Sequence, residues 1–217
     1  MTAHLDALVL DARDPVRLAE FWGALLGWER HGDRLVSADD PGFDLLFAHS
    51  DEPKRGPNQA HFDLTSTTPT QQAETVARVL ELGGDHLDIG QGEVDHVVMQ
   101  DPEGNAMCVI PYGNRFLAGC PFLGGLSGDG TQALGYFWAA ALGYPLVWDQ
   151  DTETAVQSPR GGTKLTWGGI PLAEDTHLHR LRWQVSTDDP DALARLGATH
   201  VDGATWLDPD GNQFYLR

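Results

Sequence analysis

The chain has 217 residues and a formal net charge of −18, from 14 basic and 32 acidic residues. This charge opposes binding to nucleic acid and to anionic membranes, and it attracts cationic partners. No apolar run approaches the ~20 residues of a membrane span, the first residues lack the pattern of an export signal, and two cysteines are too few for a disulfide framework. We therefore expect a cytoplasmic protein that binds neither nucleic acid nor membrane.

The first predicted elements are a strand over residues 5–10 and the helix that follows it. Asp14 is the predicted N-cap, Pro15 takes the first helical position and Gly27 ends the helix. One apolar helical face is formed by Leu18, Phe21, Trp22, Leu25 and Leu26.

A second strand and helix are predicted further along the first half. The strand covers residues 61–64. Thr68 and Gln71 have the spacing of a capping box at the start of the helix, and Leu82-Gly83 closes it.

The second half of the chain repeats these signals. The segment from Leu18 to Trp28 returns as Leu134 to Tyr144, and the turn Asp101-Pro102-Glu103-Gly104-Asn105 returns as Asp208-Pro209-Asp210-Gly211-Asn212. A last short helix is predicted from Asp189 to Gly197. Internal repeats of this kind predict several copies of one structural unit.

Each helix is followed by short β-type runs separated by turn residues. The unit is a strand, a helix and two or three strands, repeated four times, which predicts an α+β fold of tandem βαβββ modules. The repeat divides the chain into two halves, residues 1–115 and 116–217, with a loop at residues 51–60 and a connection at residues 113–125. The strands predicted after the helices cover residues 34–37, 43–48, 94–99, 106–111, 145–148, 154–157, 163–167 and 213–216.

The combination of these motifs resembles the vicinal oxygen chelate superfamily, which includes glyoxalase I, bleomycin-resistance proteins, fosfomycin-resistance enzymes and extradiol dioxygenases. The pattern Pro15-x-x-Leu18-Ala19-x-Phe21-Trp22, together with His61-Phe62-Asp63-Leu64, is similar to the two-half glyoxalase-like proteins of this group. The resemblance covers nearly the whole chain. It implies the fold rather than a reaction, because one fold hosts unrelated chemistries.

The resemblance also implies where a metal would be held. In catalytic members a divalent ion lies in a cleft lined by paired modules and is bound by His and Glu residues of first and last strands. The corresponding first-strand positions are Ala7, His61, Leu123 or Gly124, and Arg182, and the last-strand positions include Cys108 and Tyr215.

Of this set only His61 is a usual ligand, with Cys108 as a soft partner, whereas catalytic zinc takes three protein ligands. A third donor would have to be Asp63, which shares a strand face with His61. We therefore expect no cofactor, well under one equivalent of metal in the purified protein, and neither glyoxalase I nor extradiol dioxygenase chemistry.

Strand alternation predicts which side chains line the two clefts. Charged and aromatic groups together favour flat organic ligands, held by stacking and cation–π contacts. The first half presents His61, Asp63 and Cys108 to its cleft, and the second half presents Arg182, Gln184 and Tyr215.

Three tryptophans, Trp148, Trp167 and Trp206, lie on or next to strands of the second half. They are candidates for ligand contacts, although alternation directs half of any strand to the outer face of the sheet. His177 and His179 would share a face of an extended segment, but no third metal ligand accompanies them.

Three hypotheses about function follow. The first is a metal-free protein of the bleomycin-resistance kind that binds a small, aromatic organic molecule, for sequestration, resistance or the handling of a secondary metabolite. The second is an enzyme of the same fold, a lyase, isomerase or dioxygenase, that uses His61 and Asp63 as an acid–base pair or holds a nonstandard metal set. The third is an interaction module whose clefts have lost their function.

The charged groups predict ligand preference separately for each cleft. Asp63 beside His61 favours a cationic or zwitterionic ligand in the first cleft, whereas Arg182 favours a carboxylate or phenolate in the second. The two halves would pair within one chain, giving a monomer with a pseudo-twofold axis, or across chains in a homodimer.

Overall fold

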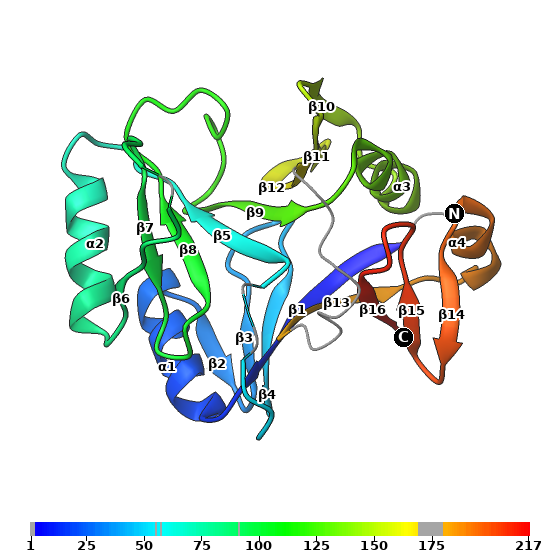
Figure 1. The fold of residues 1–217 in the computed structure, drawn as a ribbon, viewed down its shortest axis with the longest axis horizontal. Coiled ribbons are helices and arrows are strands. Elements are labelled where there is room, and N and C mark those ends of the chain that lie inside the picture. Colours follow the sequence, from blue (N-terminus) through cyan, green and yellow to red (C-terminus); the bar gives the residue numbers. More distant parts are fainter. Residues whose placement is uncertain (1–2, 55, 57, 91, 169–179) are drawn as a thin grey trace.

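The structure is a computed structural model that describes residues 3–54, 56, 58–90, 92–168 and 180–217. It consists of four βαβββ units, here called modules 1 to 4, and so confirms the predicted α+β fold of tandem modules (Figure 1). None of the helices in the described ranges is long and apolar enough to cross a membrane. His177 and His179 lie outside the described residues.

The modules follow one another along the chain with the same order of elements. Module 1 contains β1 (His4–Ala12), α1 (Pro15–Leu26), β2 (Glu29–His31), β3 (Arg34–Val36) and β4 (Asp44–His49). Module 2 contains β5 (Ala60–Leu64), α2 (Gln71–Glu81), β6 (Asp85–His86), β7 (Val97–Gln100) and β8 (Ala106–Val109). Module 3 contains β9 (Leu123–Asp129), α3 (Gln132–Leu142), β10 (Leu146–Gln150), β11 (Glu153–Ser158) and β12 (Gly161–Gly168). Module 4 contains β13 (Leu181–Ser186), α4 (Pro190–Leu196), β14 (Thr199–Asp202), β15 (Thr205–Leu207) and β16 (Gln213–Leu216).

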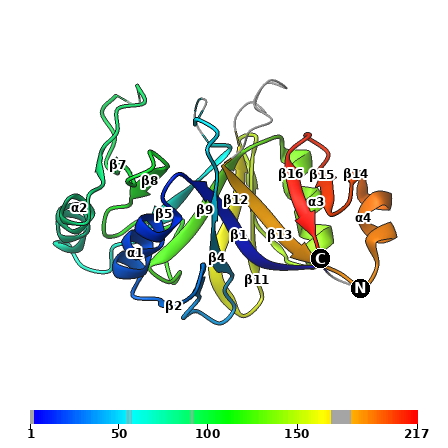
Figure 2. The same ribbon diagram turned by 90° about the horizontal axis from the view of Figure 1, so that it is seen from below.

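The two eight-stranded sheets each combine one module from each half of the chain. One sheet has the order β14-β15-β16-β13-β1-β4-β3-β2 and joins modules 4 and 1, and the other has the order β10-β11-β12-β9-β5-β8-β7-β6 and joins modules 3 and 2. In both sheets the first strands of the two modules pair antiparallel at the centre. Helices α1 and α2 lie toward one end of the molecule and α3 and α4 toward the other, so the sheets run between the halves (Figure 2).

Local signals place α1 where the sequence predicts it. The Asp14 side chain accepts a hydrogen bond of 3.0 Å from the backbone N–H of Arg17, and Pro15 starts the helix. Gly27 ends it with φ = 72°, a left-handed conformation that glycine adopts without strain. Helix α4 begins in the same way, with Asp189 capping Ala192 at 3.1 Å.

Helix α2 departs from the prediction at its N-terminus. Its N-cap is Thr70 rather than Thr68, and no side-chain hydrogen bond caps it. The reason is that the Gln71 side chain accepts hydrogen bonds from the backbone N–H and the hydroxyl of Thr67, at 2.6 and 2.7 Å, and so does not form the predicted box with Thr68.

The short strands β2, β6, β14 and β15 were not predicted from the sequence. The side chains of β2, β6 and β14 are all exposed, so these segments lack the alternation of apolar and polar residues that marks a half-buried strand. The predicted strand over residues 94–99 also begins later, at Val97.

The core contains buried side chains from all four modules in one cluster. Trp22 of α1 packs against Phe62 of β5 at a ring-centroid distance of 4.9 Å. Trp138 of α3 packs against Trp183 of β13 at 4.6 Å. Both helical tryptophans are thus core residues, and Trp22 lies on the apolar helical face predicted from the sequence.

The repeated acidic turns connect modules. Glu103, in the turn between β7 and β8, accepts hydrogen bonds from the backbone N–H groups of Arg13 and Asp14, at 3.1 and 3.0 Å, at the start of α1. Asp210, at the corresponding position of module 4, accepts from the backbone N–H and hydroxyl of Thr131 at the start of α3, at 2.7 and 3.0 Å. Each turn therefore caps the helix of the preceding module.

Candidate functional site

A row of polar side chains crosses the four central strands of the sheet formed by modules 2 and 3. Ser127 of β9 lies opposite His61 of β5 on one side and Thr166 of β12 on the other. Asp63, two residues after His61, lies opposite Cys108 of β8. Directly paired residues project from the same face of a sheet, so all five side chains share one surface.

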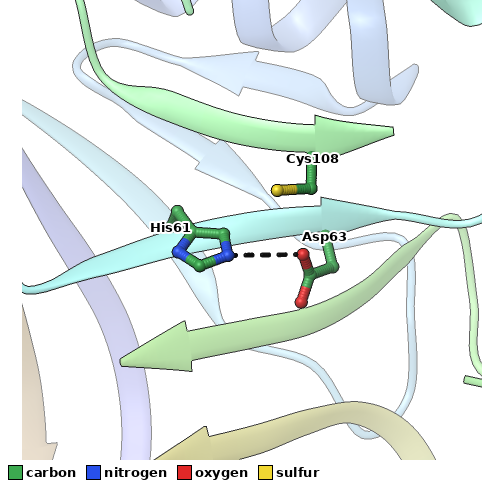
Figure 3. Close-up of side chains that lie close together, drawn as sticks. All are labelled: His61, Asp63 and Cys108. Carbon is green, nitrogen blue, oxygen red and sulfur yellow. Dashed lines mark ion pairs between the residues drawn. The ribbon is translucent and has the colours of Figure 1, made fainter. Parts of the chain in front are cut away.

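Hydrogen bonds hold Asp63 in a fixed orientation. The Thr166 hydroxyl donates to Ser127 Oγ at 2.9 Å, and the Ser127 hydroxyl donates to Asp63 Oδ2 at 2.5 Å. The other carboxylate oxygen, Oδ1, lies 3.5 Å from His61 Nε2 (Figure 3). The carboxylate of Asp63 therefore joins the hydroxyl groups of module 3 to the imidazole of module 2.

Three metal-ligating groups converge at this point. One donor atom each from His61, Asp63 and Cys108 lies within 4.8 Å of the other two, and Figure 3 shows the thiol of Cys108 beside the imidazole and the carboxylate. Gly125 on β9 leaves the space that the carboxylate needs, because a Cβ there would lie 2.8 Å from Asp63 Oδ2.

The electrostatic environment favours a protonated His61. Burial lowers the pKa of its imidazole, but hydrogen bonds and Coulombic attraction involving Asp63 and Cys108 outweigh burial and raise that pKa to about 10. At neutral pH and without a metal ion, the ring is therefore a cation that donates hydrogen bonds. A metal ion binding here would have to displace its proton.

A cavity of about 390 Å³ opens beside the row of polar groups. His61 and Asp63 form one part of its wall, and two further carboxylates, Asp129 and Glu153, form another. Burial raises the pKa of Asp129, and the charge of His61 partly offsets this effect. The cavity is therefore acidic, with one cationic group.

Aromatic rings complete the wall of this cavity. Phe116 and Trp148 meet edge to face, with ring centroids 5.6 Å apart and an interplanar angle of 82°. Lys164 places its ammonium 4.7 Å from the centroid of the Phe116 ring, a cation–π contact already present at the edge of the site.

The structure places the three predicted tryptophans differently. Trp148 lines the cavity and is half-buried. Trp167 also reaches the wall, but it is 4% exposed and stacks on Trp138 at 6.5 Å, so it is mainly a core residue. Trp206 packs on Phe214 and His200 in the other sheet and is not in the wall of this cavity.

The second predicted group, Arg182, Gln184 and Tyr215, lies in the sheet formed by modules 1 and 4. Arg182 binds both carboxylate oxygens of Asp11 on β1, each at 2.5 Å, and its guanidinium lies 5.2 Å from the centroid of the Tyr215 ring. Gln184 pairs with Tyr215 in register. The charge of Arg182 is thus balanced by Asp11, which weakens the expected preference for an anion.

These positions correct the prediction that each half of the chain forms its own cleft. The side chains of both predicted groups lie in sheets that combine two halves, because first strands pair between modules 2 and 3 and between modules 1 and 4. Sequence reasoning missed the module 3 residues for this reason. No local signal in the sequence identifies them, because only the antiparallel pairing of the first strands brings Ser127 opposite His61. The residues missed at the site are Phe116, Ser127, Asp129, Glu153 and Thr166.

A family model described as a glyoxalase-like domain matches residues 7–110 and 127–217. The chain therefore belongs to the glyoxalase-like family, within the vicinal oxygen chelate superfamily. A comparison with curated protein sequences found no match.

Solved structures show the same fold. Glyoxalase I from Zea mays superposes with a TM-score of 0.66 at 16% identity, over 99% of this chain and 92% of that one. A putative dioxygenase from Bacillus subtilis subsp. subtilis str. 168 superposes with a TM-score of 0.60 at 13% identity, over 100% of this chain and 86% of that one. At these identities the similarity concerns the fold alone.

The donor groups present fit a divalent metal better than the sequence indicated. The expectation of a metal-free cleft counted two donors, His61 and Cys108, and the structure brings Asp63 to the same point, with Gly125 making room for it. Nitrogen, oxygen and sulfur donors of these kinds are accepted by zinc.

Proposed function

We propose that this protein binds a small organic molecule that carries an aromatic ring and a positive charge, in the cavity between modules 2 and 3. The observation that supports this proposal is the wall of the cavity, in which the rings of Phe116 and Trp148 face the same space as the carboxylates of Asp129 and Glu153. Its volume of about 390 Å³ is in the range of ligand sites for small molecules.

Two effects favour a cation over an anion of the same size. Ring faces attract a cation by about 0.5–2 kcal/mol per well-placed contact, and the carboxylates add Coulombic attraction in a partly desolvated space. The net charge of −18 also accelerates the encounter with a cation. Sequestration or handling of such a molecule, in a cytoplasm that keeps Cys108 and Cys120 reduced, is the role we propose.

Paired aromatic ligands that differ only in charge test this proposal. We expect the cationic member of each pair to quench tryptophan fluorescence and to bind at least tenfold more tightly, with an association rate that falls as salt rises. Glu153→Gln and Trp148→Leu should weaken binding of the cation. Glu29→Gln should not, because this side chain is 88% exposed and is not part of the cavity wall. Equal binding of anions, unchanged by Glu153→Gln, would refute the proposal.

A second candidate function is an enzyme of this fold, a lyase, isomerase or dioxygenase, in which His61 and Asp63 form an acid–base pair. The hydrogen-bonded series from Thr166 through Ser127 to Asp63 favours it, because such a series orients the group that transfers a proton. Since His61 is a cation at neutral pH, it would act first as the acid. Turnover of a bound ligand that His61→Gln abolishes, with binding retained, would support this candidate.

A further inference from the structure

We propose that a groove at the junction of modules 1, 3 and 4 binds a small zwitterion, a molecule that carries an ammonium and a carboxylate group on an aliphatic body. The groove has a volume of about 570 Å³ and shares no residue with the wall of the cavity between modules 2 and 3. The inference therefore does not depend on the organic ligand proposed above.

The wall of the groove carries charges of both signs. In a chain of net charge −18 an anion is opposed at long range, whereas a cation in the groove meets guanidinium groups from three modules. A zwitterion can place each of its charges against an opposite charge, so this wall favours it over either ion alone. Arginine and aspartate side chains line the groove in equal number, namely Arg34, Arg160, Arg217, Asp6, Asp40 and Asp44.

Two of the acidic side chains are held in place by the protein. Asp44 uses both carboxylate oxygens, one for Arg34 Nη1 at 2.6 Å and the other for the backbone N–H of Ser37 at 2.9 Å. Asp6 accepts a hydrogen bond of 3.0 Å from the Ser186 hydroxyl through Oδ1 alone, and Oδ2 has no partner in the part of the chain that the structure describes. Asp6 is therefore oriented and still open to an ammonium group.

Two of the arginines are open to a carboxylate. Arg217 forms no ion pair and no side-chain hydrogen bond with the described residues, and its backbone N–H, bonded to Val185 O at 2.9 Å, fixes its place after β16. Arg160 pairs with Asp40 at 2.9 Å, but these side chains are 67% and 83% exposed. Such an exposed pair contributes about 0–1 kcal/mol, so a ligand carboxylate can replace Asp40 readily.

Close packing of two loops builds the groove. Pro41, in the loop between β3 and β4, meets the hairpin between β11 and β12 at Gly162, where a Cβ would overlap the Pro41 carbonyl oxygen. Gly162 also has φ = 88°, a conformation that glycine adopts without strain. Arg160 belongs to the same hairpin, so this contact places its guanidinium beside module 1.

An apolar recess adjoins the groove and fits part of an aliphatic body. Its free volume of about 20 Å³ admits one methyl-sized group. A branched body such as that of leucine therefore suits the site better than glycine does. The recess shares four residues with the groove and has two buried side chains in its wall, and the six residues are Leu5, Pro41, Gly42, Tyr144, Phe43 and Leu165.

Three ligands with one carbon skeleton test the proposal by isothermal titration calorimetry. L-leucine has both charges, isocaproate lacks the ammonium group, and isoamylamine lacks the carboxylate. We expect L-leucine to bind at one site per chain, at least about tenfold more tightly than either analogue and more tightly than glycine. The dipeptide Gly-Leu, compared with L-leucine, distinguishes a peptide from a free amino acid as the source of the zwitterion.

Charge variants locate the site. Arg217→Gln and Asp6→Asn should each weaken L-leucine binding at least about tenfold, and asparagine can still accept the hydrogen bond from Ser186. Arg195→Gln is the matched control, because Arg195 is 66% exposed and is not in the groove, and Trp148→Leu in the other cavity should also leave the affinity unchanged.

Circular dichroism establishes that each variant is folded. Three results would overturn the proposal: no binding of L-leucine at millimolar concentration, binding of isocaproate or isoamylamine as tightly as L-leucine, or an affinity that neither Arg217→Gln nor Asp6→Asn changes.

Discussion

The indole Nε1 of Trp22 donates a hydrogen bond of 3.0 Å to a carboxylate oxygen of Asp101. Trp22 belongs to α1 of module 1, and Asp101 begins the acidic turn of module 2. The same carboxylate accepts hydrogen bonds from the backbone N–H groups of Glu103 and Asn105 and from the Asn105 side chain, and Asp101 is 2% exposed. One buried side chain thus organises the turn and connects it to the helix of another module.

Replacing Asp101 should lower the free energy of unfolding by more than replacing an ordinary turn residue does. The loss of one cap-like turn hydrogen bond costs about 1 kcal/mol. Because Asp101→Ala leaves several buried donors unpaired, we expect a loss of about 3 kcal/mol in the free energy of unfolding. A double-mutant cycle of Asp101→Ala with Trp22→Phe, measured by urea unfolding, should give a coupling energy of about 1 kcal/mol. Additive effects of the two substitutions would contradict a stabilising contact between these side chains.

Breaking the ion pair between Glu103 and Arg180 should destabilise the protein to a similar degree. These side chains are 13% and 7% exposed and lie 2.9 Å apart, and Glu103 also caps α1. Removing one partner of such a buried pair typically costs about 3–5 kcal/mol, so we expect Glu103→Ala to destabilise the protein by about 3 kcal/mol. Arg195→Ala, which breaks a pair whose arginine is 66% exposed, should change stability by less than about 1 kcal/mol in the same chemical unfolding assay.

The repeated helices differ at one position in a way that packing explains. Ala19 in α1 corresponds to Gly135 in α3, and a Cβ at Gly135 would overlap the Thr154 side chain. Alanine is favoured over glycine within a helix by about 1 kcal/mol, but we expect Gly135→Ala to destabilise by about 2 kcal/mol because of this overlap. Thr154→Ala should not rescue it, since the Thr154 Cβ itself is in the way.

The matched control for this variant is Gly23→Ala in α1. A Cβ at Gly23 would lie 3.2 Å from a terminal methyl of Leu35, a contact that a small rotation relieves. We expect thermal unfolding to show a change within about 0.5 kcal/mol for this variant. Equal destabilisation by both substitutions would show that the overlap with Thr154 does not decide the effect.

The pH dependence of stability should reveal the raised pKa of the Asp208 carboxyl. Burial raises the pKa of its carboxyl to about 6, despite hydrogen bonds from Asn212. The folded chain therefore binds the proton more tightly than the unfolded chain, whose pKa is about 4. This contribution to stability is fully present below pH ~4 and is lost as the pH rises to about 6.

Urea unfolding at several pH values measures this contribution. Relative to Asp208→Asn, which does not titrate, the wild-type protein should lose on the order of 2 kcal/mol between pH 4 and pH 7. Asp151→Asn is the control, because Asp151 is exposed, and its pH profile should follow that of the wild type. A wild-type profile parallel to that of Asp208→Asn would contradict the raised pKa.

Local signals explain which parts of the fold could be predicted. Helix α1 was predicted because Asp14 and Pro15 at its start, and Gly27 at its end, each act on the residues next to them. The pairing of modules depends on contacts between residues far apart in the sequence, such as Ser127 opposite His61, and no local pattern encodes it. The exposed strands β2 and β14 carry no hydrophobic periodicity and were missed.

The candidate site was predictable only in the parts that depend on a single strand or turn. His61 and Cys108 follow from the ligand positions that the family resemblance implies, and Asp63 from alternation along the strand of His61. Their convergence depends on β5 pairing with β8, and their support by Ser127 depends on β5 pairing with β9. The ion pair between Arg182 and Asp11 could not be predicted for the same reason, because it joins modules 4 and 1.

The shared sheets also determine how the chain can be divided. A cut near residue 115 would remove β13 from β1 and β9 from β5, leaving an open backbone edge at the centre of each sheet. Exposed edges of this kind pair with any available strand and promote aggregation. The two fragments should therefore recover solubility by complementing each other, and the intact chain should lose both sheets in one cooperative transition.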